Sequence, residues 1–147
     1  MTDPEGTVEG LVTVIVDDDE NDRYLTRRFL GKHQEFGEVL EARTGNEFLQ
    51  EIADGGKLEL LTKGRVLVLM DINMPGLNGF QTAEALAERV ARNEVPASVV
   101  VLMFTSSNNP QDRARAEAIS IVQGYIVKPI GHDNVKTLLE HWQASQG

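Results

Sequence analysis

The amino-acid sequence predicts an α/β fold in which a parallel sheet lies between two layers of helices. Three nearly continuous apolar runs, rich in valine and each followed by polar residues, occupy 11–16, 65–70 and 98–104. Such runs are typical of strands that are covered on both faces, as in a parallel sheet. Segments with apolar residues at helical spacing separate the runs, so strand and helix are expected to alternate along the chain.

The first expected strand, 11–16, precedes a helix that ends near Gly31 and carries four large apolar side chains: Tyr24, Leu25, Phe29 and Leu30. A weaker strand candidate, 38–42, leads to a second helix. Thr44 and Glu47 have the spacing of a capping box, in which each side chain bonds the backbone N–H of the other residue. This pattern predicts that the second helix begins directly after Thr44.

The third expected strand, 65–70, is followed by a helix that Asn78 is suited to cap. Asn109 and Pro110 indicate the start of a fourth helix after the strand 98–104. Proline is favoured at the first helical position because its missing N–H is not needed there. Both helices therefore have defined starts.

The fifth strand candidate, 125–127, precedes a last helix with Asp133 as its expected cap. Five strand–helix alternations imply a three-layer (βα)5 sandwich with right-handed crossovers. The flavodoxin-like strand order 2-1-3-4-5 is the expected five-stranded version. We expect a disordered leader at 1–10, one domain over 11–143, and no output domain.

The composition argues against several classes of function. Acidic residues outnumber basic ones by 23 to 14, and the formal charge of -9 argues against binding nucleic acid. The absence of cysteine excludes disulfides and thiolate metal ligands, which fits a reducing cytoplasm, the expected location. No stretch approaches the roughly 20 apolar residues of a membrane span, so we expect no membrane partner.

Polar residues stand at the ends of four of the five expected strands. The first strand ends in three aspartates at 17–19, the third in Asp71, the fourth in Thr105 and Ser106, and the fifth in Lys128 and Pro129. Each has a structural explanation when taken singly, such as a turn or the start of a helix. Because ligands bind outside the carboxyl ends of parallel strands, we expect the set to form one pocket.

The residue types in this pocket fit phosphoryl transfer. Several carboxylates in one pocket repel one another unless a cation lies among them, and an oxygen-rich site favours Mg²⁺ over zinc. A carboxylate is a competent nucleophile toward phosphorus and forms an acyl phosphate. Mg²⁺ and Lys128 would offset charge on the phosphoryl oxygens, and the hydroxyl of Thr105 would donate a hydrogen bond to one of them.

Four segments resemble the signature blocks of response-regulator receiver domains, and the resemblance covers about residues 11–142. The segments are VIVDDDEND, VLVLMDINMPGLNGF, VVVLMFTSS and GYIVKPI. The resemblance implies a single-domain response regulator that catalyses only its own phosphorylation and dephosphorylation and is not otherwise an enzyme. It also implies Mg²⁺ as the cofactor and a sensor histidine kinase or a phosphotransfer protein as the phosphoryl donor.

The resemblance implies roles position by position. Asp71 matches the phosphoacceptor. The implied metal ligands are Asp17, Asp18, Asp71 and the backbone carbonyl of Asn73, with Asp17 acting mostly through water. The implied phosphoryl-binding and switch residues are Thr105, Ser106, Lys128 and Tyr125, and the Lys128–Pro129 bond is expected to be cis. Asp19 matches a more variable acidic position and is not an expected ligand.

The resemblance also implies a switch. Phosphorylation of Asp71 would draw Thr105 toward the phosphoryl group and let Tyr125 turn inward. The surface of the fourth helix, the fifth strand and the fifth helix would then change shape. A partner protein would read the state there, and a homodimer would use the same surface.

Two features refine the resemblance. The long connection 53–63, together with the FTSS block, is similar to the stand-alone receivers that partner bacterial phytochromes and related sensor kinases. Asn73 and Ser107 occupy positions that, in the family, tune hydrolysis of the acyl phosphate.

Two other functions fit parts of the sequence. A haloacid-dehalogenase-type phosphatase begins with Asp-x-Asp after a strand, which 17–19 satisfies. For such a phosphatase, Asn21 stands where threonine or valine is usual, and the sequence lacks the acidic pair expected after Lys128. The DINMPGLNGF block would also have no role in it. A receiver-like interaction module without phosphorylation is the second alternative.

Overall fold

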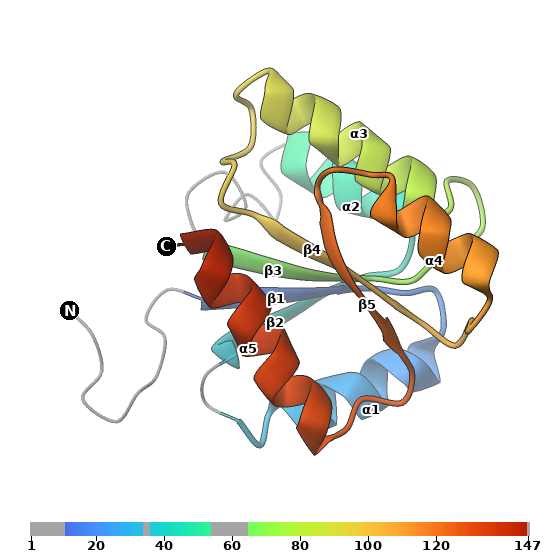
Figure 1. Cartoon of the computed structure of the whole chain (residues 1–147), viewed down its shortest axis with the longest axis vertical. Helices are drawn as coiled ribbons and strands as arrows, with labels where there is room; N and C mark the ends of the chain where they lie inside the picture. Colours follow the sequence, from blue (N-terminus) through green and yellow to red (C-terminus); the bar gives the residue numbers. More distant parts are fainter. Residues whose placement is uncertain (1–10, 34–35, 54–64, 147) are drawn as a thin grey trace.

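Strand and helix alternate five times in the computed structural model, which describes residues 11–33, 36–53 and 65–146 (Figure 1). The expected leader, and all but the first residue of the long connection 53–63, lie outside these ranges. The elements are β1 (Leu11–Val16), α1 (Glu20–Leu30), β2 (Glu38–Ala42), α2 (Gly45–Ala53), β3 (Arg65–Met70), α3 (Gly79–Ala91), β4 (Val100–Thr105), α4 (Pro110–Glu117), β5 (Val122–Val127) and α5 (His132–Gln146).

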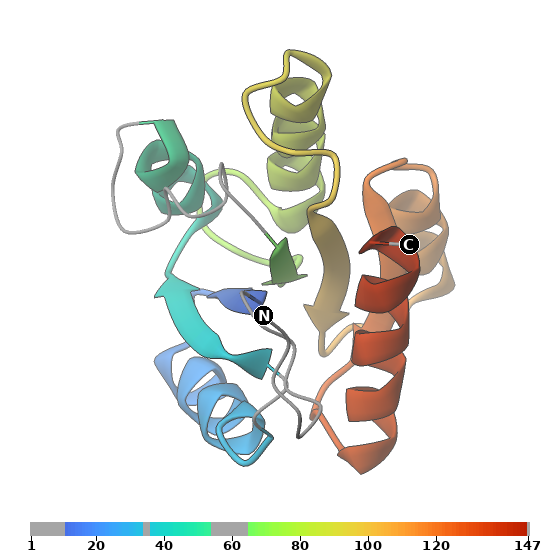
Figure 2. The same ribbon diagram turned by 90° about the vertical axis from the view of Figure 1, so that its left-hand side faces the viewer.

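The strands form one parallel sheet in the order β2-β1-β3-β4-β5, which confirms the predicted α/β fold and strand order. Helices α1 and α5 cover one face of the sheet, and α2, α3 and α4 cover the other (Figures 1 and 2). The chain therefore forms the expected three layers. Strand β1 reverses the direction in which the chain winds, so the sheet has its switch point between β1 and β3.

The core explains why the sequences of the three central strands, β1, β3 and β4, are almost wholly apolar. Successive side chains of a strand point to opposite faces, so in β3 Val66, Val68 and Met70 join one hydrophobic cluster while Leu67 and Leu69 join the other. All five are fully buried. A strand with helices on both faces has no position at which a polar side chain is exposed to water.

Three predicted helix starts are confirmed. The hydroxyl of Thr44 accepts a hydrogen bond from the N–H of Glu47 at 3.0 Å. Asn78 and Gln81 form a complete capping box at the start of α3, and the side chain of Asn109 accepts from the N–H of Gln111 before Pro110. These caps satisfy N–H groups that have no partner inside the helix.

The boundaries of β4, β5 and α5 differ from the prediction. Strand β4 spans Val100–Thr105 instead of 98–104, and β5 begins at Val122, three residues before the predicted 125–127. Helix α5 begins at His132, so Asp133 lies in its first turn and is not its cap. Asn134 instead accepts a hydrogen bond from the N–H of Gly131 at 2.8 Å.

Two of the four apolar residues expected on the first helix lie outside the core. Tyr24 is 56% exposed and Leu25 is 54% exposed. The buried positions of α1 are Arg23, Thr26 and Leu30, because its inward face also carries polar groups that bond to the sheet. In the part of the chain that the structure covers, we find no helix with both the length and the apolar character to cross a membrane.

Candidate functional site

Three carboxylates converge where β1 and β3 end. One oxygen from each of Asp17, Asp18 and Asp71 lies within 4.8 Å of the others, and Asp17 and Asp71 are buried while Asp18 is exposed. The chain direction brings them together, because both strands are parallel and the N–H of Asp71 donates to the carbonyl of Val16 at 2.9 Å. An all-oxygen donor set on a partly open cleft fits Mg²⁺.

A cleft of about 850 Å³ opens above these carboxylates. Five of the predicted site residues line it: Asp18, Asp71, Asn73, Ser106 and Lys128. Asp17 and Thr105 are buried, 2% and 0% exposed, at the ends of β1 and β4. The structure therefore brings the polar strand ends to one edge of the sheet, as the parallel topology predicts.

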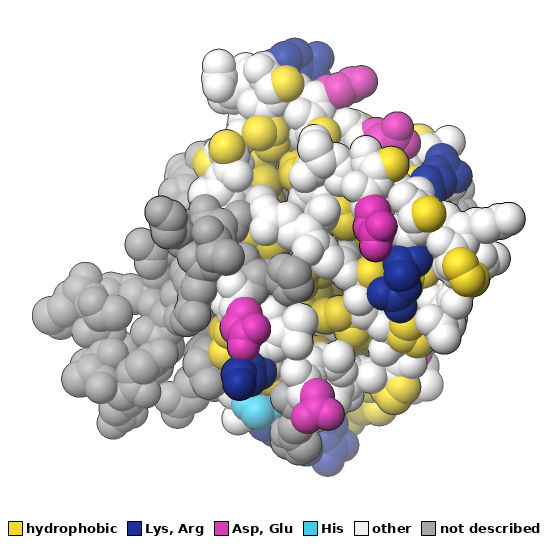
Figure 3. Space-filling view, in the orientation of Figure 1, with side chains coloured by type: hydrophobic (Ala, Val, Ile, Leu, Met, Phe, Trp, Pro, Cys, Tyr) yellow, Lys and Arg dark blue, Asp and Glu magenta, His cyan; other side chains and the backbone are white. Residues whose placement is uncertain are grey.

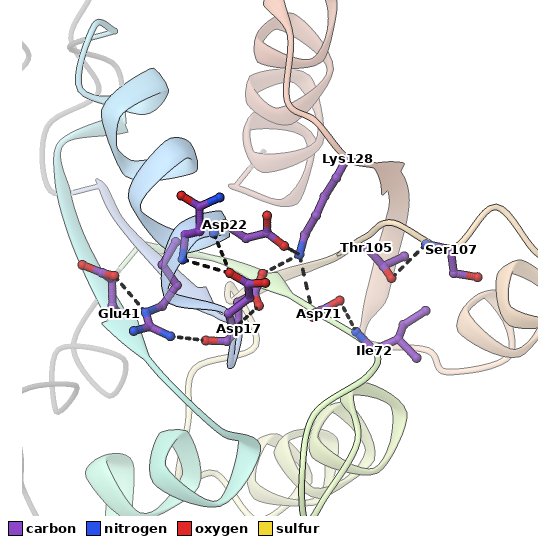
Figure 4. Close-up of polar contacts among 11 residues, drawn as sticks. Asp17, Asp22, Glu41, Asp71, Ile72, Thr105, Ser107 and Lys128 are labelled. Carbon is purple, nitrogen blue, oxygen red and sulfur yellow. Dashed lines mark hydrogen bonds and ion pairs between the residues drawn. The ribbon is translucent and has the colours of Figure 1, made fainter.

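Lys128 reaches into this site from the end of β5 (Figure 4). Its Nζ lies 2.5 Å from Oδ2 of Asp17, 3.0 Å from Oδ2 of Asp22 and 3.7 Å from Oδ2 of Asp71. The following peptide bond, to Pro129, is cis. Burial alone would lower the pKa of Lys128, but its hydrogen bonds to Asp17 and Asp22 raise the pKa above its usual value, so the ammonium stays charged.

Burial raises the pKa of Asp71 to about 6 from its usual 3.8. The positive charge of Lys128 lowers it, Asp17 raises it, and hydrogen bonds from the N–H of Ile72 and from Thr105 lower it. The net effect is that the ionised carboxylate is held in a position where it is unfavourable without a further cation.

We therefore expect an Asp71→Asn variant to be more stable than the wild type at pH 7.5 in a chelator. Because folding raises the pKa of Asp71, the cost of the ionised group develops between about pH 3.8 and about pH 6, is fully present above that range, and is lost as the pH falls through it. A shift of about two units corresponds to roughly 3 kcal/mol, so we expect a gain of about 1 to 3 kcal/mol. In urea denaturation curves the gain should be nearly constant above about pH 6.5 and should shrink as the pH falls from about 6 to about 4.

Adding Mg²⁺ at pH 7.5 is the control for that prediction. The cation should stabilise the wild type by mass action and the variant much less, because the variant lacks one of the three carboxylates. A variant that is no more stable than the wild type in chelator would show that Lys128 already compensates the charge of Asp71.

Three residues that the sequence did not single out support the β1 end of the site. Nη1 of Arg23 donates to the carbonyl of Asp17 at 2.8 Å, and Nε of Arg23 pairs with Glu41 on β2 at 3.1 Å. Asp22 pairs with Lys128. Asp22 and Arg23 lie in the first turn and a half of α1, directly after the aspartate run. This position was the sequence signal that could have identified them as site residues.

The β4 end of the site is connected to Tyr125 through Ser107. The hydroxyl of Thr105 accepts a hydrogen bond from the N–H of Ser107 at 3.2 Å, and the hydroxyl of Tyr125 donates to the carbonyl of Ser107 at 2.8 Å. The guanidinium of Arg113 on α4 lies over the Tyr125 ring, 4.5 Å from its centre. A displacement at Thr105 therefore has a short bonded route to the predicted switch residue.

Gly79 fixes the distance between α3 and the strand that carries Asp71. Its N–H donates to the carbonyl of Ile72 at 2.8 Å. A Cβ on Gly79 would overlap the carbonyl oxygen of Asp71 and lie 2.9 Å from the Asp71 carbonyl carbon and from Cα of Ile72. Only glycine lets the helix start pack this closely against the site.

The chain is similar in sequence to known receiver proteins. The family model of the response regulator receiver domain matches residues 13–140, inside the predicted domain 11–143. Protein PilH of Pseudomonas aeruginosa is 31% identical over 122 residues, which are 83% of this chain and 88% of PilH.

Solved structures share the fold. A two-component response regulator from Cytophaga hutchinsonii superimposes with a TM-score of 0.76 at 23% identity, covering 90% of this chain and 96% of that one. The phosphorylated cyanobacterial phytochrome response regulator RcpA gives a TM-score of 0.66 at 20% identity, covering 93% and 89%.

The family match argues against the dehalogenase-type phosphatase, and the interaction module without phosphorylation remains an alternative for experiment to decide. A dehalogenase-type phosphatase would have its nucleophile at Asp17 and no role for the loop after β3, whereas the matched region contains every strand end of the site. Proteins of the matched family are phosphoacceptor signalling domains of two-component systems. With its topology, its acidic triad and this match, the chain belongs to the family of response regulator receiver domains.

Proposed function

We propose that this domain accepts a phosphoryl group onto Asp71 from a sensor histidine kinase or a phosphotransfer protein. The observation that supports this most is the convergence of three carboxylates beside the Lys128 ammonium in an open cleft. In the reaction, an Asp71 carboxylate oxygen forms a bond to phosphorus as the bond between phosphorus and the donor imidazole breaks. The product is an acyl phosphate.

The surrounding residues bind and orient the group that arrives. Asp17, Asp18, Asp71 and the carbonyl of Asn73 would hold Mg²⁺, which supplies positive charge to the phosphoryl oxygens. Lys128 supplies a second positive charge from the β5 side. The hydroxyls of Thr105 and Ser106 stand at the end of β4, where they can donate hydrogen bonds to phosphoryl oxygens.

The test is the intact mass of the protein after incubation with a small-molecule phosphoryl donor such as acetyl phosphate. We expect a gain of one phosphoryl group that requires Mg²⁺ and is lost in chelator. A protein that gains no mass under either condition would be an interaction module without phosphorylation, and the proposal would fail.

The contacts of Ser107 suggest how phosphorylation would change the surface. If the Thr105 hydroxyl moves toward a phosphoryl oxygen, the N–H of Ser107 loses its acceptor and the loop after β4 must shift. That shift moves the carbonyl to which Tyr125 is bonded. The α4, β5 and α5 surface, which faces the viewer in Figure 3, mixes hydrophobic and charged side chains and is where we expect an output partner or a homodimer to bind.

We also propose a docking position for the phosphoryl donor beside the cleft. An apolar groove lined by Leu25, Phe29, Phe104, Pro129 and Ile130 shares Asp22 and Lys128 with the site region. Leu25, on α1, lines the groove and is 54% exposed. A donor helix packed on this groove would lie beside the cleft that contains Asp71, because the groove and the cleft share Asp22 and Lys128.

We expect a Leu25→Ser variant to accept phosphoryl groups about tenfold more slowly from its protein donor, because an apolar anchor at the centre of an interface contributes roughly 1 to 2 kcal/mol. The rate from acetyl phosphate should stay within twofold of the wild type, since Leu25 does not line the acidic cleft. An equal loss with both donors would mean that the substitution damages the site, and no loss with either would place the donor elsewhere.

Two other expectations stay predictions. The likeness to the phytochrome response regulator concerns the fold alone, and the connection 53–63 that suggested a phytochrome-type partner lies almost entirely outside the described residues. A cytoplasmic location likewise awaits a direct measurement.

A further inference from the structure

Lys128 has three carboxylate neighbours, and the two that are closest belong to Asp17 and Asp22. Its side chain is 10% exposed, and its Nζ contacts Asp17 and Asp22 at hydrogen-bond distance while Asp71 lies farther, at 3.7 Å. On another side, Nζ lies 5.6 Å from the centre of the Phe104 ring. These contacts hold the ammonium in one position, and they differ in how each would respond to a bound metal ion.

The number of N–H groups on the Lys128 ammonium limits how many partners it can bind at once. A lysine ammonium has three N–H groups. Two of them are used by the oxygens of Asp17, at 2.5 Å, and of Asp22, at 3.0 Å. The third is not used by either of them and is available to the Asp71 side, where Oδ2 lies 3.7 Å from Nζ and where the incoming phosphoryl oxygens would be.

Asp17 and Asp22 differ in what else they bind. Asp17 belongs to the carboxylate triad, so a cation in the triad competes with Lys128 for its oxygens. Asp22 is not among the three residues of the triad. Asp22 is thus the anion that stays with Lys128 when the triad binds a metal.

The backbone that carries Asp22 is well fixed. Asp22 lies in the first turn of α1, and the side chain of Asp19, the N-cap, accepts hydrogen bonds from the N–H groups of Asn21 and Asp22 at 2.9 and 3.1 Å. Figure 4 shows Asp22 and Lys128 meeting from α1 and from the end of β5. The contact joins two elements 106 residues apart in the chain.

We propose that Asp22 is a positioning residue for phosphoryl transfer: it holds the Lys128 ammonium so that the remaining N–H group meets an oxygen of the incoming phosphoryl group. This inference rests on the proposed function of Asp71. It makes Asp22 part of the phosphoryl-binding machinery although Asp22 itself contacts neither the phosphoryl group nor the metal.

The test is binding of beryllium trifluoride, a non-covalent phosphoryl mimic, in the presence of Mg²⁺, measured by fluorine NMR. An Asp22→Asn variant should bind the mimic about three- to fivefold more weakly, the effect of one partly exposed ion pair. Glu20→Gln is the matched control, since Glu20 is an exposed acid in the same turn and is not among the ion-pair partners of Lys128. Mg²⁺ titrations without the mimic should change equally in both variants.

A double-mutant cycle separates positioning from a general charge effect. In a Lys128→Gln background, the Asp22→Asn substitution should leave the affinity for the mimic unchanged. The inference is overturned if Asp22→Asn behaves like Glu20→Gln, if it binds the mimic more tightly than the wild type, or if its effect persists without Lys128. Failure of the wild type to bind the mimic would instead overturn the proposed function.

Discussion

An Asp71→Asn variant is expected to lose phosphoryl labelling completely. An amide oxygen is a poor nucleophile toward phosphorus, and removal of the reacting group in a covalent mechanism typically lowers the rate by a factor of about 10³ or more. The substitution preserves the shape of the side chain and can keep the hydrogen bond from the N–H of Ile72. The measurement is the intact mass after incubation with acetyl phosphate and Mg²⁺.

Asp19→Asn is the matched control for this experiment. It removes one carboxylate from the same edge of the sheet, and asparagine is as good an N-cap as aspartate, so α1 should keep its start. Labelling should persist in this variant. Labelling that survives in Asp71→Asn would place the nucleophile at another carboxylate, with buried Asp17 the first candidate.

A Gly79→Ala variant is expected to lose about 3 kcal/mol of unfolding free energy. The added methyl group would overlap the backbone of Asp71 and Ile72, which cannot move without shifting the end of β3. Because Asp71 is carried on that backbone, stabilisation by Mg²⁺ should fall as well. Urea denaturation with and without Mg²⁺ measures both effects.

Gly131→Ala controls for the general effect of adding a methyl group to a glycine. Its Cβ would lie 3.6 Å from Oδ1 of Asn134, an ordinary contact. We expect its stability to stay within about 0.5 kcal/mol of the wild type. Equal stability of the two alanine variants would show that α3 can move away from β3 at little cost.

The strand ends were predictable from sequence because parallel topology alone brings them together. Once 11–16 and 65–70 are read as buried strands, Asp17 and Asp71 must lie at the same edge, and the register Val16–Met70 places them side by side. Helix caps such as Asn78 were equally predictable from the sequence, because a cap and its hydrogen-bond partners are neighbours in the chain.

Other features depend on tertiary contacts that local patterns do not encode. The pair between Asp22 and Lys128 requires two side chains from opposite ends of the sequence to choose compatible conformations. Strand β5 extends back to Val122 despite Gln123 and Gly124, because pairing with β4 continues through an irregular register between Val101 and Leu102. The exposure of Leu25 was also not readable from its apolar character, because the helix face that packs on the sheet includes Arg23.

The hydrogen bond from Arg23 to the carbonyl of Asp17 affects which part of the site can move when Asp71 is modified. Arg23 ties the end of β1 to β2 through Glu41, so that half of the site is braced by contacts to backbone and to a neighbouring strand. The opposite half, after β4, is held through Ser107, whose hydroxyl pairs with Asp112 and whose carbonyl pairs with Tyr125. If Asp71 is phosphorylated as proposed, we expect the half that is held through Ser107 to move more easily than the half that Arg23 holds. We therefore expect movement toward α4 and β5, while α1, which forms part of the proposed donor site, keeps its position before and after transfer.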